Sequence, residues 1–106
     1  MILIDNNNIT LIKGNTAYLS IALEGDYSYQ EGDILTLTVR KNIDDKDVAL
    51  TKTIAANENF EFAPEDTKAA AAGRYVYDVQ LTTVDNDVFT VVAPSDFVLK
   101  EAVTRE

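Results

Sequence analysis

Apolar side chains recur at every second position along most of this chain, and this alternation restricts the fold more than any other feature of the sequence. Leu35, Leu37 and Val39 alternate with polar residues, and the segments 17–23 and 75–81 repeat the pattern. Successive side chains of a β-strand point to opposite faces of the sheet, so each run predicts a strand with one buried and one wetter face. The sequence therefore predicts an all-β fold.

Turn-forming residues separate these runs at short intervals. Asn, Asp and Gly gather between the runs, where they tolerate left-handed backbone angles or hydrogen-bond their own backbone. The length predicts one domain, residues 1–106, and many short strands joined by such turns are typical of a β-sandwich or barrel. We expect strands near residues 2–4, 8–12, 16–24, 34–41, 48–55, 58–62, 74–84, 88–93 and 96–103.

One segment breaks the alternation. Residues 64–72 are rich in Ala, the strongest helix former, and they begin with Pro64, which suits a first helical position. Glu65 and Asp66 suit the positive end of the helix dipole, and Gly73 suits the C-terminal cap. We expect one or two helical turns here, crossing from one sheet to the other.

Composition excludes several classes of function. The chain has no Cys and no His, which excludes a disulfide scaffold, a thiolate zinc site, a cysteine nucleophile and a Ser-His-Asp triad. The formal charge is −9, from 18 acidic and 9 basic residues, which argues against nucleic acid or an anionic membrane as a partner. Asp78 is the carboxylate placed mid-strand among aromatic residues, but its alternation with Tyr77 and Val79 puts it on the wetter face. We therefore expect a protein that is not an enzyme and that holds no cofactor.

No targeting or membrane segment is visible in the sequence. The apolar residues 2–4 end at Asp5, without the basic start and longer apolar stretch of a secretory signal. No window approaches the ~20 apolar residues that span a bilayer. We expect synthesis and folding in a cytoplasm.

A short motif surrounds the expected helix. Asp66-Thr67 is followed by Gly73-x-Tyr75-x-Tyr77 at the start of a predicted central strand. This arrangement resembles the corner of immunoglobulin-like sandwiches, in which a Tyr hydroxyl returns to the backbone a few residues upstream. The resemblance gives that role to Tyr75 and implies an immunoglobulin-like antiparallel β-sandwich of about seven to nine strands. The antibody-type disulfide is absent, because Tyr77 stands where those domains carry a Cys.

A wider resemblance covers most of the chain. It is carried by Ile12-Lys13-Gly14-Asn15-Thr16, Glu31-Gly32-Asp33, Pro64-Glu65-Asp66-Thr67, the run from Gly73 to Leu81, and Phe97-Val98-Leu99. This order is similar to small β-sandwich proteins of phage and prophage structural-gene clusters, and to the N-terminal domain of phage baseplate upper proteins. The resemblance implies a virion-associated structural or assembly module of a tail or baseplate. Its partners are then other phage structural proteins or copies of itself, as a homo-oligomer.

Two surfaces are candidate partner contacts. Tyr27 and Tyr29 lie in a polar loop, where they either present rigid rings to a partner or fold back over the end of the domain. Phe97 and Leu99 lie in a predicted edge strand that could pair with another chain, and residues 2–4 form a second such edge. A carbohydrate-binding or adhesion module that uses the loop tyrosines is the alternative function.

Charged residues have simpler interpretations. The acidic segments 44–47 and 85–87 could offer oxygens to Ca²⁺, but they lack the Gly and closing Glu of a known calcium loop, so we interpret them as hairpin turns. Arg40 and Arg74 lie on the polar faces of predicted strands. Pairing across strands with Asp78 or Glu61 would account for both of them.

Overall fold

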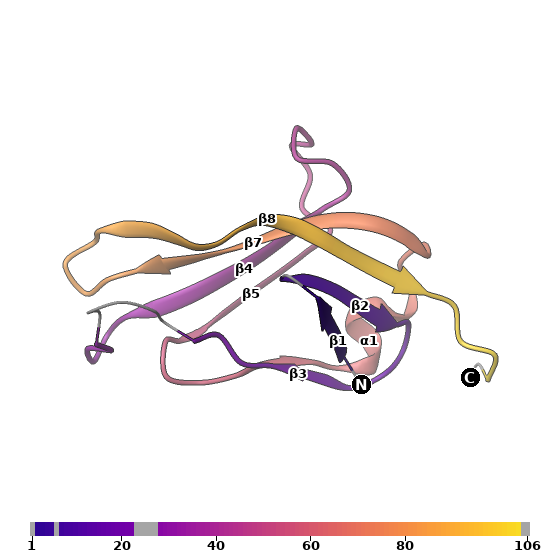
Figure 1. Ribbon diagram of the computed structural model, residues 1–106, viewed down its shortest axis with the longest axis horizontal. Helices are drawn as coiled ribbons and strands as arrows, with labels where there is room; N and C mark the ends of the chain where they lie inside the picture. Colours follow the sequence, from indigo (N-terminus) through magenta and orange to yellow (C-terminus); the bar gives the residue numbers. More distant parts are fainter. Residues whose placement is uncertain (1, 6, 23–27, 105–106) are drawn as a thin grey trace.

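A computed structural model describes residues 2–5, 7–22 and 28–104, and these form eight strands and one short helix (Figure 1). The end of the expected strand at residues 16–24 lies outside the described residues. The elements are β1 (Ile2–Asp5), β2 (Asn8–Ile12), β3 (Ala17–Leu19), β4 (Ile34–Arg40), β5 (Leu50–Ala55), β6 (Phe60–Phe62), α1 (Pro64–Lys68), β7 (Gly73–Thr82) and β8 (Val88–Lys100).

Six strands form one curled sheet in the order β1-β2-β8-β7-β4-β5, and β3 pairs with β6 in a separate two-stranded ribbon. All pairs are antiparallel except β2 with β8, which run parallel. The prediction of an all-β fold is confirmed. The immunoglobulin-like sandwich stays a prediction, since the observed arrangement is a mixed sheet with a two-stranded ribbon against it (Figure 1).

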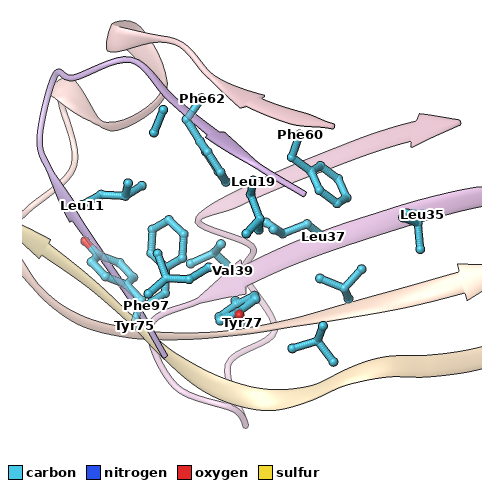
Figure 2. Close-up of a cluster of buried hydrophobic side chains, with 14 of the residues drawn as sticks. Leu11, Leu19, Leu35, Leu37, Val39, Phe60, Phe62, Tyr75, Tyr77 and Phe97 are labelled. Carbon is cyan, nitrogen blue, oxygen red and sulfur yellow. The ribbon is translucent and has the colours of Figure 1, made fainter. Parts of the chain in front are cut away.

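The buried side chains form one cluster between the curled sheet and the ribbon (Figure 2). Alternate residues of β4 and β7 enter it, as the period-two pattern predicts, while Thr36 and Gln80 point to the opposite face. The buried apolar residues are Ile9, Leu11, Ala17, Leu19, Leu35, Leu37, Val39, Ala56, Phe60, Phe62, Tyr75, Tyr77, Val79, Leu81, Val92, Phe97 and Leu99.

Phe97 of β8 is the aromatic centre of this core. Its ring centroid lies 5.9 Å from that of Phe62 on the ribbon and 5.9 Å from that of Tyr77 on the neighbouring strand. The two rings meet that of Phe97 at interplanar angles of 54° and 66°, which are favourable tilted and edge-to-face geometries. Phe97 therefore joins the ribbon to the large sheet.

The helix begins at Pro64 as expected but ends at Lys68, well before residue 72. The Thr67 hydroxyl accepts a hydrogen bond from the Gly14 N–H at 2.9 Å, which fixes the helix against the turn after β2. The expected capping role of Gly73 is wrong. Gly73 is the first residue of β7 with φ of 142°, because the chain must turn sharply from the helix into the strand.

Strand β8 is continuous where the sequence predicted two strands separated around Pro94. From Tyr77 to Val79, β7 advances two residues, whereas β8 advances three, from Val92 to Ser95. This β-bulge takes up the proline, which cannot donate to the ladder, without ending the strand. The predicted break at Pro94 is therefore an irregularity within one strand.

The corner before β7 has the hydrogen bond that the sequence motif predicted. The Tyr75 hydroxyl donates to the carbonyl oxygen of Ala71 at 2.7 Å, four residues upstream. The Lys41 ammonium lies 4.6 Å from the centroid of the same ring and donates to the Arg74 carbonyl at 3.1 Å. The predicted role of Tyr75 is confirmed, and Lys41 adds a cation–π contact to its ring.

Substitutions on the two faces of the sheet should differ strongly in cost. Leu37→Ala should lower the free energy of unfolding by ~2–5 kcal/mol because it leaves a cavity, and Val79→Asp should destabilise at least as much because it buries an unpaired charge. Thr36→Ala and Gln80→Ala should change it far less. Urea unfolding followed by circular dichroism measures all four, and equal losses would contradict the face assignment.

Removing the corner hydrogen bond should have a smaller, measurable effect. Tyr75→Phe keeps the buried ring but leaves the Ala71 carbonyl without its donor, so we expect a loss of about 1 kcal/mol in urea unfolding. Tyr18→Phe is the matched control, because Tyr18 is 61% exposed and should lose almost nothing. Equal stability of Tyr75→Phe and the parent would exclude a stabilising role for the corner.

Candidate functional site

The N-terminal part of β8 is paired on one side only. β2 pairs with β8 from Phe97 to Lys100, while β7 pairs along nearly its whole length. The Asn8 side chain accepts a hydrogen bond from the Asp96 N–H at 2.9 Å, and this contact marks the end of the β2 pairing. Residues 88–95, which we call the free edge, have no second strand partner among the described residues (Figure 1).

The free edge carries no charged residue, and its first two side chains are exposed and apolar. Val88 is 56% exposed and Phe89 is 54% exposed. Phe89 is paired with the buried Leu81, and paired residues share a face, so Phe89 lies on the core-facing side of the sheet. An uncovered strand of this kind presents unpaired backbone N–H and C=O groups beside apolar side chains.

The β5 edge of the same sheet carries charge, unlike the free edge. Lys52 of β5 extends its ammonium to the Asp66 carboxylate at 2.7 Å, and this carboxylate also accepts the Ala63 N–H at 2.7 Å. Burial raises the pKa of Asp66, but the hydrogen bonds from Lys52 and Ala63 outweigh it, so the pKa lies below its ordinary value. A charged pair therefore occupies the β5 edge, and charges on an edge oppose pairing with other strands.

A cavity of about 450 Å³ lies beside the free edge, on the core-facing side of the sheet. Val91 and Val92 form one wall, and Leu19 to Ala22 form the other, with Asn7 and Tyr77 completing the lining. The Tyr77 hydroxyl donates to the Asn7 carbonyl oxygen. Burial raises the pKa of Tyr77 to about 12, so the hydroxyl stays a neutral donor at physiological pH.

Asp33 fixes the far end of the β7–β8 hairpin, and sequence reasoning did not single it out. It is fully buried, and its carboxylate accepts the Gln30 and Val84 N–H groups, each at 2.9 Å. Its own carbonyl accepts the Ala56 N–H at 3.0 Å. The sequence showed only a Glu-Gly-Asp turn, although Asp directly before an apolar strand is a recognised signal for a local side-chain turn.

The predicted partner contacts have different outcomes in the structure. Tyr29 is 38% exposed, and Tyr27 lies outside the described residues. The prediction of an edge at Phe97 and Leu99 is wrong, because this part of β8 is paired with β2 and with β7, and the two side chains are 1% and 4% exposed. The predicted second edge at residues 2–4 is confirmed as a position, since β1 is the outermost strand of the sheet.

The predicted partners of the two arginines are also wrong. Arg40 donates to the carbonyl oxygens of Asp45 and Lys46, at 3.1 and 3.0 Å, because the loop after β4 folds back over it. Arg74 pairs with Asp96 on β8 at 3.3 Å, because that carboxylate lies on the adjacent strand.

In both acidic turns, a side chain accepts a hydrogen bond from a backbone N–H of the same turn. The Asp45 carboxylate accepts the Asn42 N–H at 3.2 Å, and the Asp87 N–H donates to the Thr83 hydroxyl at 3.1 Å. Over residues 2–5, 7–22 and 28–104, no three His, Cys, Asp or Glu residues are grouped so that they could hold a metal ion. In the same ranges, no helix is long and apolar enough to cross a membrane.

Comparison with protein-family models, with curated proteins and with solved structures finds no match to this chain. The site must therefore be interpreted from its own geometry. That geometry consists of an uncharged strand edge, an exposed aromatic side chain on it and a cavity beside it.

Replacing Asp33 should loosen the end of the hairpin that carries the free edge. Asp33→Asn keeps the shape, but its NH₂ group cannot accept, so one buried N–H loses its partner at a cost of about 1–3 kcal/mol. Asp87→Asn, in an exposed turn, is the control and should be nearly neutral. Urea unfolding gives the loss, and amide hydrogen exchange should accelerate only in Asp33→Asn, at whichever of Val84 and Gln30 faces the new NH₂ group. Unchanged exchange at both residues would contradict the anchoring role.

Proposed function

We propose that this protein is a non-enzymatic structural or assembly module that acts through protein–protein contacts at the free edge of β8. The observation that carries the proposal is that residues 88–95 carry no charge, pair with a strand on one side, and include the exposed Phe89. Extended segments commonly bind by adding a strand to such an edge: main-chain hydrogen bonds give affinity, and neighbouring pockets give specificity. Here the cavity lined by Val91 and Val92 supplies that pocket.

The contrast between the two long edges supports this assignment. Folded proteins usually block edge strands with charge, proline or bulges, because an open edge invites pairing with other chains. The β5 edge follows that rule with Lys52. The free edge has two register irregularities and Pro94 between Thr90 and Ser95, but it carries no charge, and Val88 to Thr90 are left unblocked, as expected for a surface that has a partner.

The setting that we propose is a phage or prophage tail or baseplate. This part rests on the sequence resemblance alone, and an assembly role requires neither a cofactor nor a catalytic group. The alternative is a carbohydrate-binding module that uses Tyr27 and Tyr29 together. It gains no specific support, because Tyr29 is the one member of this pair among the described residues, and it is 38% exposed.

A particle assay tests the assembly role. The chain is co-expressed with the proteins encoded beside its gene, and assembled particles are isolated by gradient sedimentation. We expect the parent chain to sediment with the particles. Thr90→Lys puts a charge on the free edge, so the amount of this variant in the particle fractions should fall at least about tenfold. Thr51→Lys is the matched control on the β5 edge, since both threonines are exposed.

Absence of the parent chain from every particle fraction would exclude the proposed setting. Equal association of the two lysine variants would exclude the free edge as the contact.

A further inference from the structure

We infer that the free edge pairs with the free edge of a second copy of this chain, in an antiparallel, two-fold dimer in which Phe89 of each copy fills the cavity of the other. This inference rests on the proposed function, because it names the partner of the same edge.

The edge is complementary to itself. Phe89 lies on the core-facing side, and the cavity wall formed by Val91 and Val92 begins two residues further along on the same side. When two copies of a strand pair antiparallel about Thr90 and Val91, residue 89 of each copy lies beside residues 91–93 of the other. Each phenyl ring then stands over the other copy's cavity, which is the reciprocity that a two-fold interface requires.

The two-fold axis in this arrangement is perpendicular to the joined sheet. Both core-facing sides therefore stay on the same side, so each ring approaches the cavity from the correct face. Leu19, Ile21 and Val92 offer apolar contacts there, and the volume of about 450 Å³ is ample for a phenyl group. A ring that is 54% exposed in the single chain becomes buried, and aromatic burial of this kind dominates many interface energies.

Charge also favours a second copy over a strongly charged partner. Two chains of charge −9 repel each other, so close contact between them needs a surface without like charges at its centre. Residues 88–95 meet that need, and Asp87 and Asp96 stand just outside the segment. The remaining repulsion is screened by salt, so the dimer should become tighter at higher ionic strength. Pairing with a basic protein would weaken instead.

Analytical ultracentrifugation of the purified chain tests the inference. We expect a monomer–dimer equilibrium whose Kd falls when salt is raised. Phe89→Ala and Thr90→Lys should each raise Kd at least about tenfold. Val103→Ala is the matched control, because Val103 is 99% exposed and follows β8 at the end opposite to the free edge, so its Kd should equal that of the parent. Circular dichroism confirms that each variant keeps its strands.

Cross-linking provides a second readout that depends on position. The chain contains no cysteine, so a single introduced thiol can form only an intermolecular disulfide. Thr90→Cys lies near the two-fold axis and should give a covalent dimer rapidly under mild oxidation. Thr51→Cys, equally exposed on β5, should give little.

Each outcome discriminates. A purified chain that stays monomeric up to about 1 mM, or a dimer that Phe89→Ala leaves intact, overturns the inference. If Thr90→Lys still abolishes particle association in that case, the proposed function stands and the edge binds a different protein. If the dimer forms as described but no particle contains the chain, self-pairing stands and the proposed setting fails.

Discussion

The packing of Phe97 against Phe62 and Tyr77 is the contact on which the rest of this fold depends. It joins the β3–β6 ribbon to β7 and β8 of the large sheet, and among the described residues the ribbon shares no backbone-paired strand with that sheet. Because these rings lie at one end of β8, the ribbon, the helix and β2 all gather there. The other end of β8 extends away with β7 as its strand partner, and that asymmetry creates the free edge.

The polar contacts of the fold serve to hold this uneven arrangement in place. Thr67 attaches the helix to the turn after β2, and Tyr75 attaches the start of β7 to the end of the helix region. At the opposite end, the Asp33 carboxylate holds the turn that joins β7 to β8. The exposed hairpin is therefore anchored at both of its ends, which favours a preformed binding surface over one that must become ordered when a partner binds.

Much of the fold could be predicted from local sequence, and the candidate site could not. Alternation identified the core faces of β4 and β7, and the Tyr75 hydrogen bond followed from a short motif, because both depend on residues close together in the chain. The edge was placed at Phe97 instead of Val88 because strand order depends on long-range pairing. No local pattern shows that β2 would cover one half of β8 and not the other. Asp33 was overlooked for a related reason: its partner at Val84 is 51 residues away.

The β5 edge is charged and the free edge of β8 is not, and this difference affects how many copies of the chain can associate. If β8 could join β5, each addition would leave a fresh edge at both ends, and association would continue into an open fibre. Lys52 on β5 and the neutral stretch on β8 make that mixed joint unfavourable. In the proposed dimer the two β8 edges pair with each other once, and no unpaired β8 edge remains for a further copy. At the β5 edge, the charge of Lys52 thus favours a finite complex over continued addition of copies.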